Sequence, residues 1–180
     1  MKRSSRIAIA VVATLGTVLA VGAIAHPEGM GPGMMMMHQG DEAFGADMRL
    51  VHGMLQSNEK IRRSVTNLPE GIRTVTESDD PQVAQFIKAH VASMEKRLSD
   101  GKIFNIFSPT LPVLFENRDA IRTMVETTEK GVIVTQTSGE AEIVTALQAH
   151  ALEVSELARD GMAAMMRGMR AGMMGRAAPR

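Results

Sequence analysis

Methionine and histidine are the residues of this chain with the clearest capacity for chemistry. The sequence holds 16 Met and five His but no Cys. Thioether sulfur is a soft ligand that favours Cu(I), and imidazole binds copper in both oxidation states. In an oxidising compartment, methionine supplies a soft ligand without the redox-labile thiol of cysteine. The composition therefore points to a copper ion as the cofactor of this chain.

The densest group of these residues lies in the segment 26–45, which is rich in Gly and Pro. Such a composition forms no regular element, so we expect a flexible arm that could wrap an ion. If a leader ends at Ala25, His26 combines a free amine with an imidazole, a chelate suited to Cu(II). The alternative is a low-complexity segment without a metal. The candidate ligands of the arm are His26, Met30, Met34, Met35, Met36, Met37 and His38.

A second group of candidate ligands lies in segments with helical spacing. His90 and Met94 are four residues apart and so share a helix face, as do Met48 and His52. If the two helices are neighbours, these side chains could converge on one metal site. His150 is a further candidate. The alternative is that His90 and His150 are core residues with local hydrogen bonds.

The C-terminal segment 162–180 carries a further methionine stripe beside arginines. Met162, Met165, Met166 and Met169 recur at helical spacing, which predicts a terminal amphipathic helix or a partly ordered tail weakened by Gly. Three of the thioethers could form a metal site. The stripe could equally pack against a neighbour, a partner or a membrane surface.

These groups are carried by a sequence that repeats itself at an offset of 60 residues. The match of 61–101 with 121–161 needs no gap, which is typical of an internal duplication. It predicts repeat 1 at about 48–101 and repeat 2 at about 108–161. The residues that recur include Ile61, Arg62, Gly71, Ser78, His90 and Gly101, matched by Ile121, Arg122, Gly131, Ser138, His150 and Gly161.

Each repeat is expected to fold as helix, short strand, helix. The apolar spacing predicts helices over 48–66 and 81–100, then over 111–128 and 140–160, while the β-branched segments 71–77 and 131–137 predict strands. Ser78 to Asp80 would cap the helix that begins at Pro81. The two strands would pair antiparallel. The expected fold class is α+β and mostly helical, with two tandem helix-strand-helix repeats forming a pseudo-two-fold four-helix domain with a two-stranded β ribbon.

The first 25 residues have the pattern of a secretory signal peptide. Lys2, Arg3 and Arg6 precede an apolar run that closes on Ala23-Ile24-Ala25, so we expect a periplasmic or secreted protein. An uncleaved anchor is the alternative. Removing three of the 20 basic residues and none of the 20 acidic ones leaves a net charge near −3, which favours no nucleic acid partner. The expected order is leader 1–25, arm 26–45, duplicated domain 46–161 and tail 162–180.

The repeated region resembles a group of exported bacterial proteins. The resemblance is carried by Gly71 to Pro81, Ala89 to Val91, Met94 to Leu98, Gly131 to Ser138 and Gln148 to Ala151. It covers residues 48–161 and implies export, these domain limits and the duplicated helix-strand-helix module, but no catalytic residue. The Met-rich ends are similar, in composition only, to periplasmic copper-handling proteins.

The sequence offers no nucleophile elbow, Gly-rich phosphate loop or cysteine nucleophile, so we expect no enzyme. The leading hypothesis is a periplasmic metal-binding protein that holds copper, as Cu(I), through Met and His for resistance, buffering or delivery. The alternative is an interaction module that docks on an envelope protein partner through the Met-rich tail. Membrane contact is expected only through an uncleaved leader or the tail, and a homodimer is left open. A copper oxygenase built on His26 would need a rigid second ligand, which a Gly/Pro arm supplies poorly.

Overall fold

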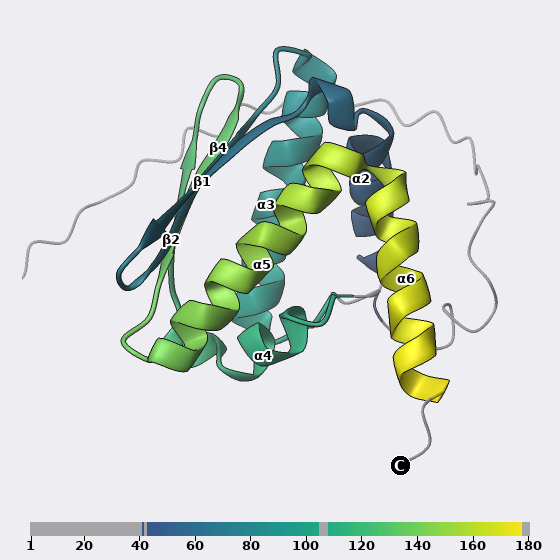
Figure 1. The fold of residues 1–180 in the computed structure, drawn as a ribbon. Coiled ribbons are helices and arrows are strands. Elements are labelled where there is room, and N and C mark those ends of the chain that lie inside the picture. Colours follow the sequence, from purple (N-terminus) through teal and green to yellow (C-terminus); the bar gives the residue numbers. More distant parts are fainter. Residues whose placement is uncertain (1–40, 42, 105–107, 178–180) are drawn as a thin grey trace, which may run out of the picture. The chain divides into compact units, whose positions relative to one another are not determined.

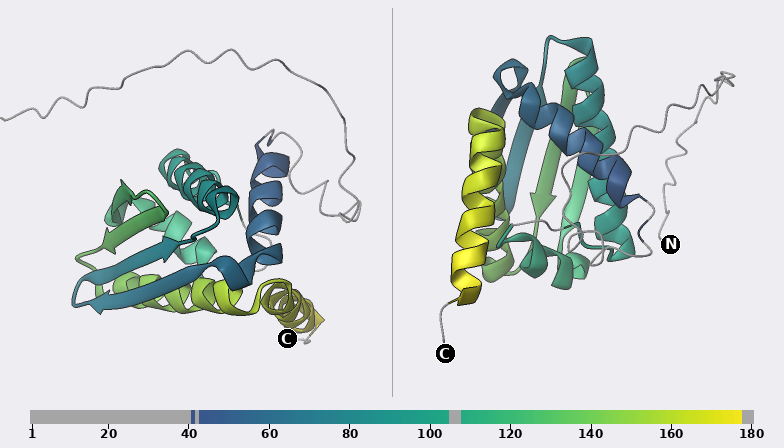
Figure 2. Two further views of the ribbon diagram at one scale, coloured as in Figure 1. Left: turned by 90° about the horizontal axis from the view of Figure 1, so that it is seen from above. Right: turned by 90° about the vertical axis from the view of Figure 1, so that its right-hand side faces the viewer.

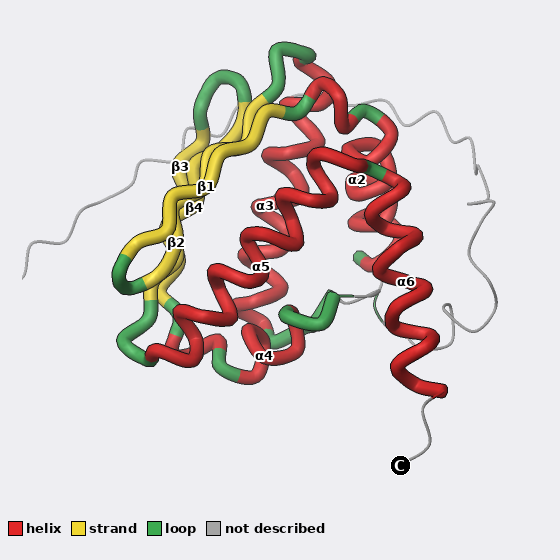
Figure 3. The backbone as a smooth tube through the Cα atoms, viewed as in Figure 1, coloured by secondary structure: helices red, strands yellow, loops and turns green. Residues whose placement is uncertain are grey.

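The computed structural model of the protein describes residues 41, 43–104 and 108–177, which form a helical layer packed on one face of a four-stranded sheet (Figures 1, 2 and 3). The strand order is β1-β2-β4-β3, and every neighbouring pair is antiparallel. The α-helices are α2 (Phe44–Gln56), α3 (Pro81–Asp100), α4 (Leu111–Glu116), α5 (Ala141–Asp160) and α6 (Met162–Ala177). The strands are β1 (Arg62–Leu68), β2 (Gly71–Glu77), β3 (Arg122–Thr127) and β4 (Gly131–Thr137). Short 3-10 turns, η1 (Asn58–Lys60) and η2 (Arg118–Ala120), precede β1 and β3.

The expected two-stranded ribbon in a four-helix domain is wrong, because each repeat contains a hairpin instead of a single strand. The predicted helix over 48–66 ends at Gln56, and Arg62–Leu68 is a strand that pairs with Gly71–Glu77. In the second repeat, the predicted helix over 111–128 ends at Glu116, and Arg122–Thr127 is a strand. Side chains of β1 and β3 alternate between exposed and half-buried positions over most of their length, which is the period of a strand with one solvated face.

The two repeats meet at the centre of the sheet, where β2 pairs with β4. The expected antiparallel pairing of these strands is confirmed. Thr74 lies opposite Val134, the residue 60 positions later, so a pseudo-two-fold axis passes through this pair. A Cβ at Gly71 would lie 2.0 Å from the carbonyl oxygen of Gln136, and one at Gly131 would lie 2.0 Å from that of Thr76. Only glycine therefore fits at these two equivalent places.

The long helices begin and end at signals that the sequence contains. The Asp80 side chain accepts hydrogen bonds from the backbone N–H groups of Gln82 and Val83, and Gly101 ends α3 in the left-handed conformation. The predicted start and end of α3 are thus confirmed. α5 has the same bounds 60 residues later.

Among the described residues, the core contains two clusters, in each of which a long helix packs on the other repeat's central strand. Ile143, Leu147 and Ala151 of α5 pack with Ile72 of β2 and with Leu114 of α4. Val83 and Ile87 of α3 pack with Val132 of β4. Because paired residues of an antiparallel sheet point to the same side, Ile72, Thr74 and Val132 share the face that both helices cover. The space between the clusters lies along the pseudo-two-fold axis.

α2 and α6 complete the helical layer beside α3 and α5. Arg97 of α3 is buried and pairs with Asp47 of α2 at 2.5 Å and with Asp41 at 2.7 Å. Its guanidinium lies 5.4 Å from the ring centre of Phe104, which contacts Phe44. α6 packs on α5 and α2, with Met165 buried. Among the described residues, none of the helices has the length and apolar character needed to cross a bilayer.

Candidate functional site

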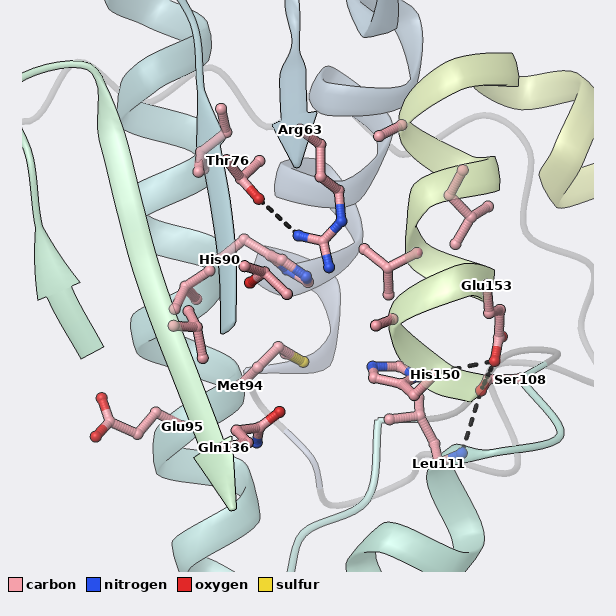
Figure 4. Close-up of a pocket in the computed structure, with 18 of the residues that line it drawn as sticks. Arg63, Thr76, His90, Met94, Glu95, Ser108, Leu111, Gln136, His150 and Glu153 are labelled. Atoms are coloured by element: carbon pink, nitrogen blue, oxygen red, sulfur yellow. Dashed lines mark hydrogen bonds and ion pairs between the residues drawn. The ribbon is translucent and has the colours of Figure 1, made fainter. Parts of the chain in front are cut away.

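A cavity of about 300 Å³ lies between the sheet and the helices α3 and α5, in the space that separates the two core clusters (Figure 4). Its floor includes Thr74 and Val134, the pair on the pseudo-two-fold axis. Most of its wall is apolar. Volumes in this range are typical of small-ligand sites, which combine apolar walls with a few convergent polar groups. The polar and sulfur-bearing side chains of this cavity are therefore the candidates for function.

The structure brings three of the sequence-predicted ligands to this cavity. His90 and Met94 project from α3 and His150 from α5, and all three line the space. Figure 4 shows the two imidazole rings and the methionine sulfur pointing into it from opposite walls. The histidines are equivalent in the two repeats, so the duplication itself places them face to face. They supply two imidazoles and one thioether.

His150 is held by a chain of hydrogen bonds on its outer side. The hydroxyl of Thr110 donates to Glu153 Oε2 at 2.6 Å and lies 2.9 Å from His150 Nδ1. Because that hydroxyl has one proton and gives it to the carboxylate, the proton of the second bond comes from Nδ1. His150 then carries its proton on Nδ1 and leaves Nε2 as a free lone pair. An imidazole oriented in this way by a hydroxyl and a carboxylate has the arrangement common among metal-binding histidines.

Glu153 is fixed in turn by neighbouring hydroxyl groups. Ser108 donates to Glu153 Oε2 at 2.9 Å, in addition to the bond from Thr110. Burial acts to raise the pKa of Glu153, but its contacts with His150, Thr110 and Ser108 outweigh burial and lower the pKa below its usual value. The carboxylate therefore stays ionised at neutral pH and keeps His150 in one orientation.

His90 lacks such support. Its Nδ1 is, among the described residues, the one buried side-chain nitrogen or oxygen without a hydrogen-bond partner. The reason is a difference between the repeats, since Leu50 and Ser93 stand where Thr110 and Glu153 serve His150. Burial lowers the pKa of His90 to about 4, with the nearby Asp47 opposing and His150 reinforcing this shift. At neutral pH, His90 is an uncharged imidazole with unused hydrogen-bonding capacity.

Arg63 of β1 adds a cation to the same cavity. Its Nη1 donates to Thr76 Oγ1 at 2.6 Å and its Nε to Ser155 Oγ at 3.3 Å. Figure 4 shows the guanidinium pointing toward the space between the two histidines. Burial lowers the pKa of Arg63 to about 10, so the group is still protonated at neutral pH. All of its hydrogen-bond partners in the described part of the chain are neutral.

The other sequence-predicted ligands lie elsewhere. His52 is exposed on α2 and does not line the cavity, while Met48 of the same helix is buried. The arm ligands His26, Met30, Met34 to Met37 and His38 lie outside the described residues. Over the ranges that are described, no three or more His, Asp or Glu side chains cluster as a metal site. The cavity group differs from such a cluster because its third donor is a thioether.

Sequence reasoning did not identify Arg63, Thr110 or Glu153 as site residues. Arg63 lies in the part of the first predicted helix, up to Thr66, that is a strand in the structure. The segment from Arg62 to Leu68, followed by Pro69 and Gly71, alternates and ends in a turn signal, which is a hairpin pattern. Thr110 and Glu153 carried no signal of their own, because their bond joins positions 43 residues apart.

Comparisons of this chain with protein-family models, with curated proteins and with solved structures find no match.

Proposed function

We propose that this chain is an exported metal-binding protein that holds copper, as Cu(I), in the cavity between its two repeats. His90, Met94 and His150 are the ligands. The observation that carries the proposal is the meeting of two duplicated imidazoles and a thioether in one cavity, with one imidazole oriented through its Nδ1 and the other without a local partner. The basic and apolar leader supports a site of action outside the cytoplasm.

The donor set suits a soft monovalent ion. Two neutral imidazoles and a thioether carry no charge, and the apolar wall favours an ion of low charge over Zn²⁺ or Cu²⁺, which retain more charge in a medium of low dielectric constant. Since His90 stays unprotonated to well below neutral pH, metal binding does not have to displace a proton from it. The role that follows is buffering or delivery of copper, with the methionine-rich segment 26–45 as a first acceptor of the ion.

The test is an anaerobic Cu(I) titration against a chromophoric chelator, using residues 26–180, the same protein without residues 26–40, and single-site variants of the cavity. We expect one tight equivalent to survive the deletion. Thr110→Val removes the group that orients His150 and should weaken Cu(I) binding by about 10- to 100-fold. His90→Gln and His150→Gln each remove a ligand itself and should weaken Cu(I) binding by at least as much. Met94→Val removes the thioether and introduces valine, the residue type that the second repeat has at the equivalent position, 154.

Two exposed residues provide matched controls. His52→Gln removes an exposed histidine, and Met124→Leu removes a methionine that is 58 % exposed on the other face of the sheet. Both should leave Cu(I) affinity unchanged. Binding that disappears with residues 26–40 and is indifferent to His90 and His150 would place the copper site in the arm and refute the cavity site. No competition by any of the proteins would refute copper binding altogether.

An iron porphyrin is a second candidate, favoured by the apolar wall and by Arg63. Haem iron takes two imidazoles from opposite walls, and a cation can pair with a propionate. A cavity of about 300 Å³ is at the lower end of the range for small-ligand sites, so a macrocycle would have to widen it whereas a single ion would not. Haem titration followed by the Soret band separates the two: a low-spin spectrum that depends on both His90 and His150 would favour the porphyrin.

A further inference from the structure

Arg63 places a cation inside the cavity that copper binding does not use. Within the described residues, no carboxylate forms an ion pair with it. Its partners are the hydroxyl groups of Thr76 and Ser155. These bonds hold the guanidinium in place but leave its charge uncompensated. Taking a cation out of water without a counter-ion is costly, and an anion that entered the cavity would remove much of that cost.

The two carboxylates that line the cavity do not neutralise Arg63. Glu153 is engaged by Ser108 and Thr110 on the outer side of His150. Glu95 is exposed to solvent. None of the carboxylates in the described ranges therefore neutralises Arg63, and an anionic ligand in the cavity would do so.

The remaining wall defines the rest of that ligand. Apolar side chains from α3, α4, β3 and α5 line the same cavity as the guanidinium. A ligand that matched both features would carry one anionic group on an apolar body. The wall includes Val91, Leu98, Leu111, Val125, Val154 and Leu157.

We propose that the cavity binds an organic monocarboxylate with an alkyl body, whose carboxylate pairs with Arg63 and whose alkyl chain lies between α3 and α5. Arginine suits this role because its planar guanidinium matches the geometry of a carboxylate. The wall then contributes by burying methylene groups. Each buried methylene should raise the affinity of the ligand about fourfold until the cavity is full. This proposal does not rest on the copper proposal, because it uses Arg63 and the apolar wall instead of the imidazoles and the thioether, although both ligands would occupy the same cavity.

The second repeat supplies a natural control for this site. The positions of Arg63 and Thr76 are occupied there by Thr123 and Gln136. Gln136 Nε2 donates to Thr123 Oγ1 at 3.2 Å, so the same two positions are bonded in both repeats. The double variant R63T/T76Q therefore copies a pair that this fold already accommodates. It keeps a hydrogen bond and removes the charge.

The test uses the metal-free full chain and three probes: decanoate, 1-decanol and acetate. Decanoate has the charge and the alkyl body, decanol has the body alone, and acetate has the charge alone. Binding is measured by isothermal titration calorimetry. The Nε–H resonance of Arg63 is followed by NMR, which reports on the guanidinium without any substitution.

We expect decanoate to bind at one per chain, to shift the Arg63 resonance, and to bind at least tenfold more tightly than decanol or acetate. R63T/T76Q should weaken decanoate by about 10- to 100-fold, the range for loss of a hydrogen bond to a charged group, with an unchanged circular dichroism spectrum. Equal binding of decanol and decanoate, unchanged decanoate affinity in the double variant, or no binding of decanoate would each overturn the proposal. Because copper is absent, none of these results depends on the metal site.

Discussion

The buried imidazole of His90 predicts a specific loss of stability in acid. We consider His90→Gln in the metal-free protein, because glutamine is polar but carries no charge at any pH. In the unfolded chain, His90 takes up a proton near its ordinary pKa of 6.5, whereas in the folded chain it does so only near 4. Between these values the unfolded state binds more protons than the folded state, so folding becomes less favourable as the pH falls.

The size of the effect follows from the two pKa values. Each pH unit between 6.5 and about 4 is worth 1.36 kcal/mol, so His90 should remove about 3 kcal/mol from the free energy of unfolding as the pH drops through this interval. Above pH 6.5, His90 is unprotonated in both states, so its titration no longer lowers the free energy of unfolding. A domain of this size has a total stability of about 5–15 kcal/mol, so the loss is a large part of it.

The measurement is urea unfolding of the wild type and of His90→Gln at a series of pH values from 7 to 4. The variant is expected to be less stable at pH 7 but to lose about 3 kcal/mol less on acidification. Carboxylates such as Asp41, whose pKa is lowered chiefly by its hydrogen bond from Arg97, also destabilise the protein in acid. They act equally in both proteins and cancel in the comparison.

His52→Gln, which removes a histidine exposed on α2, is the matched control for the substitution itself. An NMR titration of the imidazole carbons gives an independent result, in which His90 should take up its proton only near pH 4. Equal slopes for the wild type and His90→Gln, or a measured pKa of His90 near 6.5, would refute the reasoning.

Three further predictions concern the fold that holds the site. Gly71→Ala and Gly131→Ala should each destabilise the protein by at least about 2 kcal/mol, because the new Cβ meets a backbone oxygen at 2.0 Å, whereas Gly139→Ala, with no atom nearby, should be close to neutral in thermal unfolding. Arg97→Met should cost about 3–5 kcal/mol in urea unfolding, since it leaves Asp47 buried without its cation, and adding Asp47→Leu should recover much of that loss. Asp80→Ala should cost about 1 kcal/mol through loss of the helix cap, and a stability equal to wild type would show that the cap is unimportant.

Local signals were sufficient to predict the long helices and the central strands. Asp80, Pro81 and Gly101 mark the ends of α3 through capping and backbone conformation, which depend on neighbours in sequence. The β-branched residues of β2 and β4 identify these strands, and the repeat suggested their antiparallel pairing. These features could be predicted because each depends on a few adjacent residues.

The outer strands could not be predicted in the same way, since their apolar residues fit two periods. Ile61 and Val65 are four positions apart and continue the helical pattern of Leu50, Val51 and Met54. The choice of strand is made by pairing with β2, which is a tertiary contact. The helical period continues past Gln56 in the sequence, so it predicts a helix at Arg63, which lies in strand β1.

The cavity depends still more on three-dimensional contacts. The spacing of His90 and Met94 placed them on one helix face, but no spacing relates either to His150 on α5. The sequence alone does not decide whether the two histidines are core residues or ligands. In the structure the two histidines differ from each other, because the Nδ1 of His150 has a partner in Thr110 and that of His90 has none among the described residues.

The central pairing of Thr74 with Val134 bears on how the two halves of a symmetric fold can present different chemical groups to one cavity. Two separate copies of one repeat, joined about the same axis, would have to present every side chain twice, so an arginine or a glutamate in the cavity would always face its own duplicate. Joining the copies in one chain removes that constraint. One half now carries Arg63 where the other has Thr123, and Glu153 lies where the first half has Ser93. A ligand entering this cavity meets a cation from one half and a carboxylate-supported imidazole from the other, and so has a defined orientation in a fold that is otherwise symmetric.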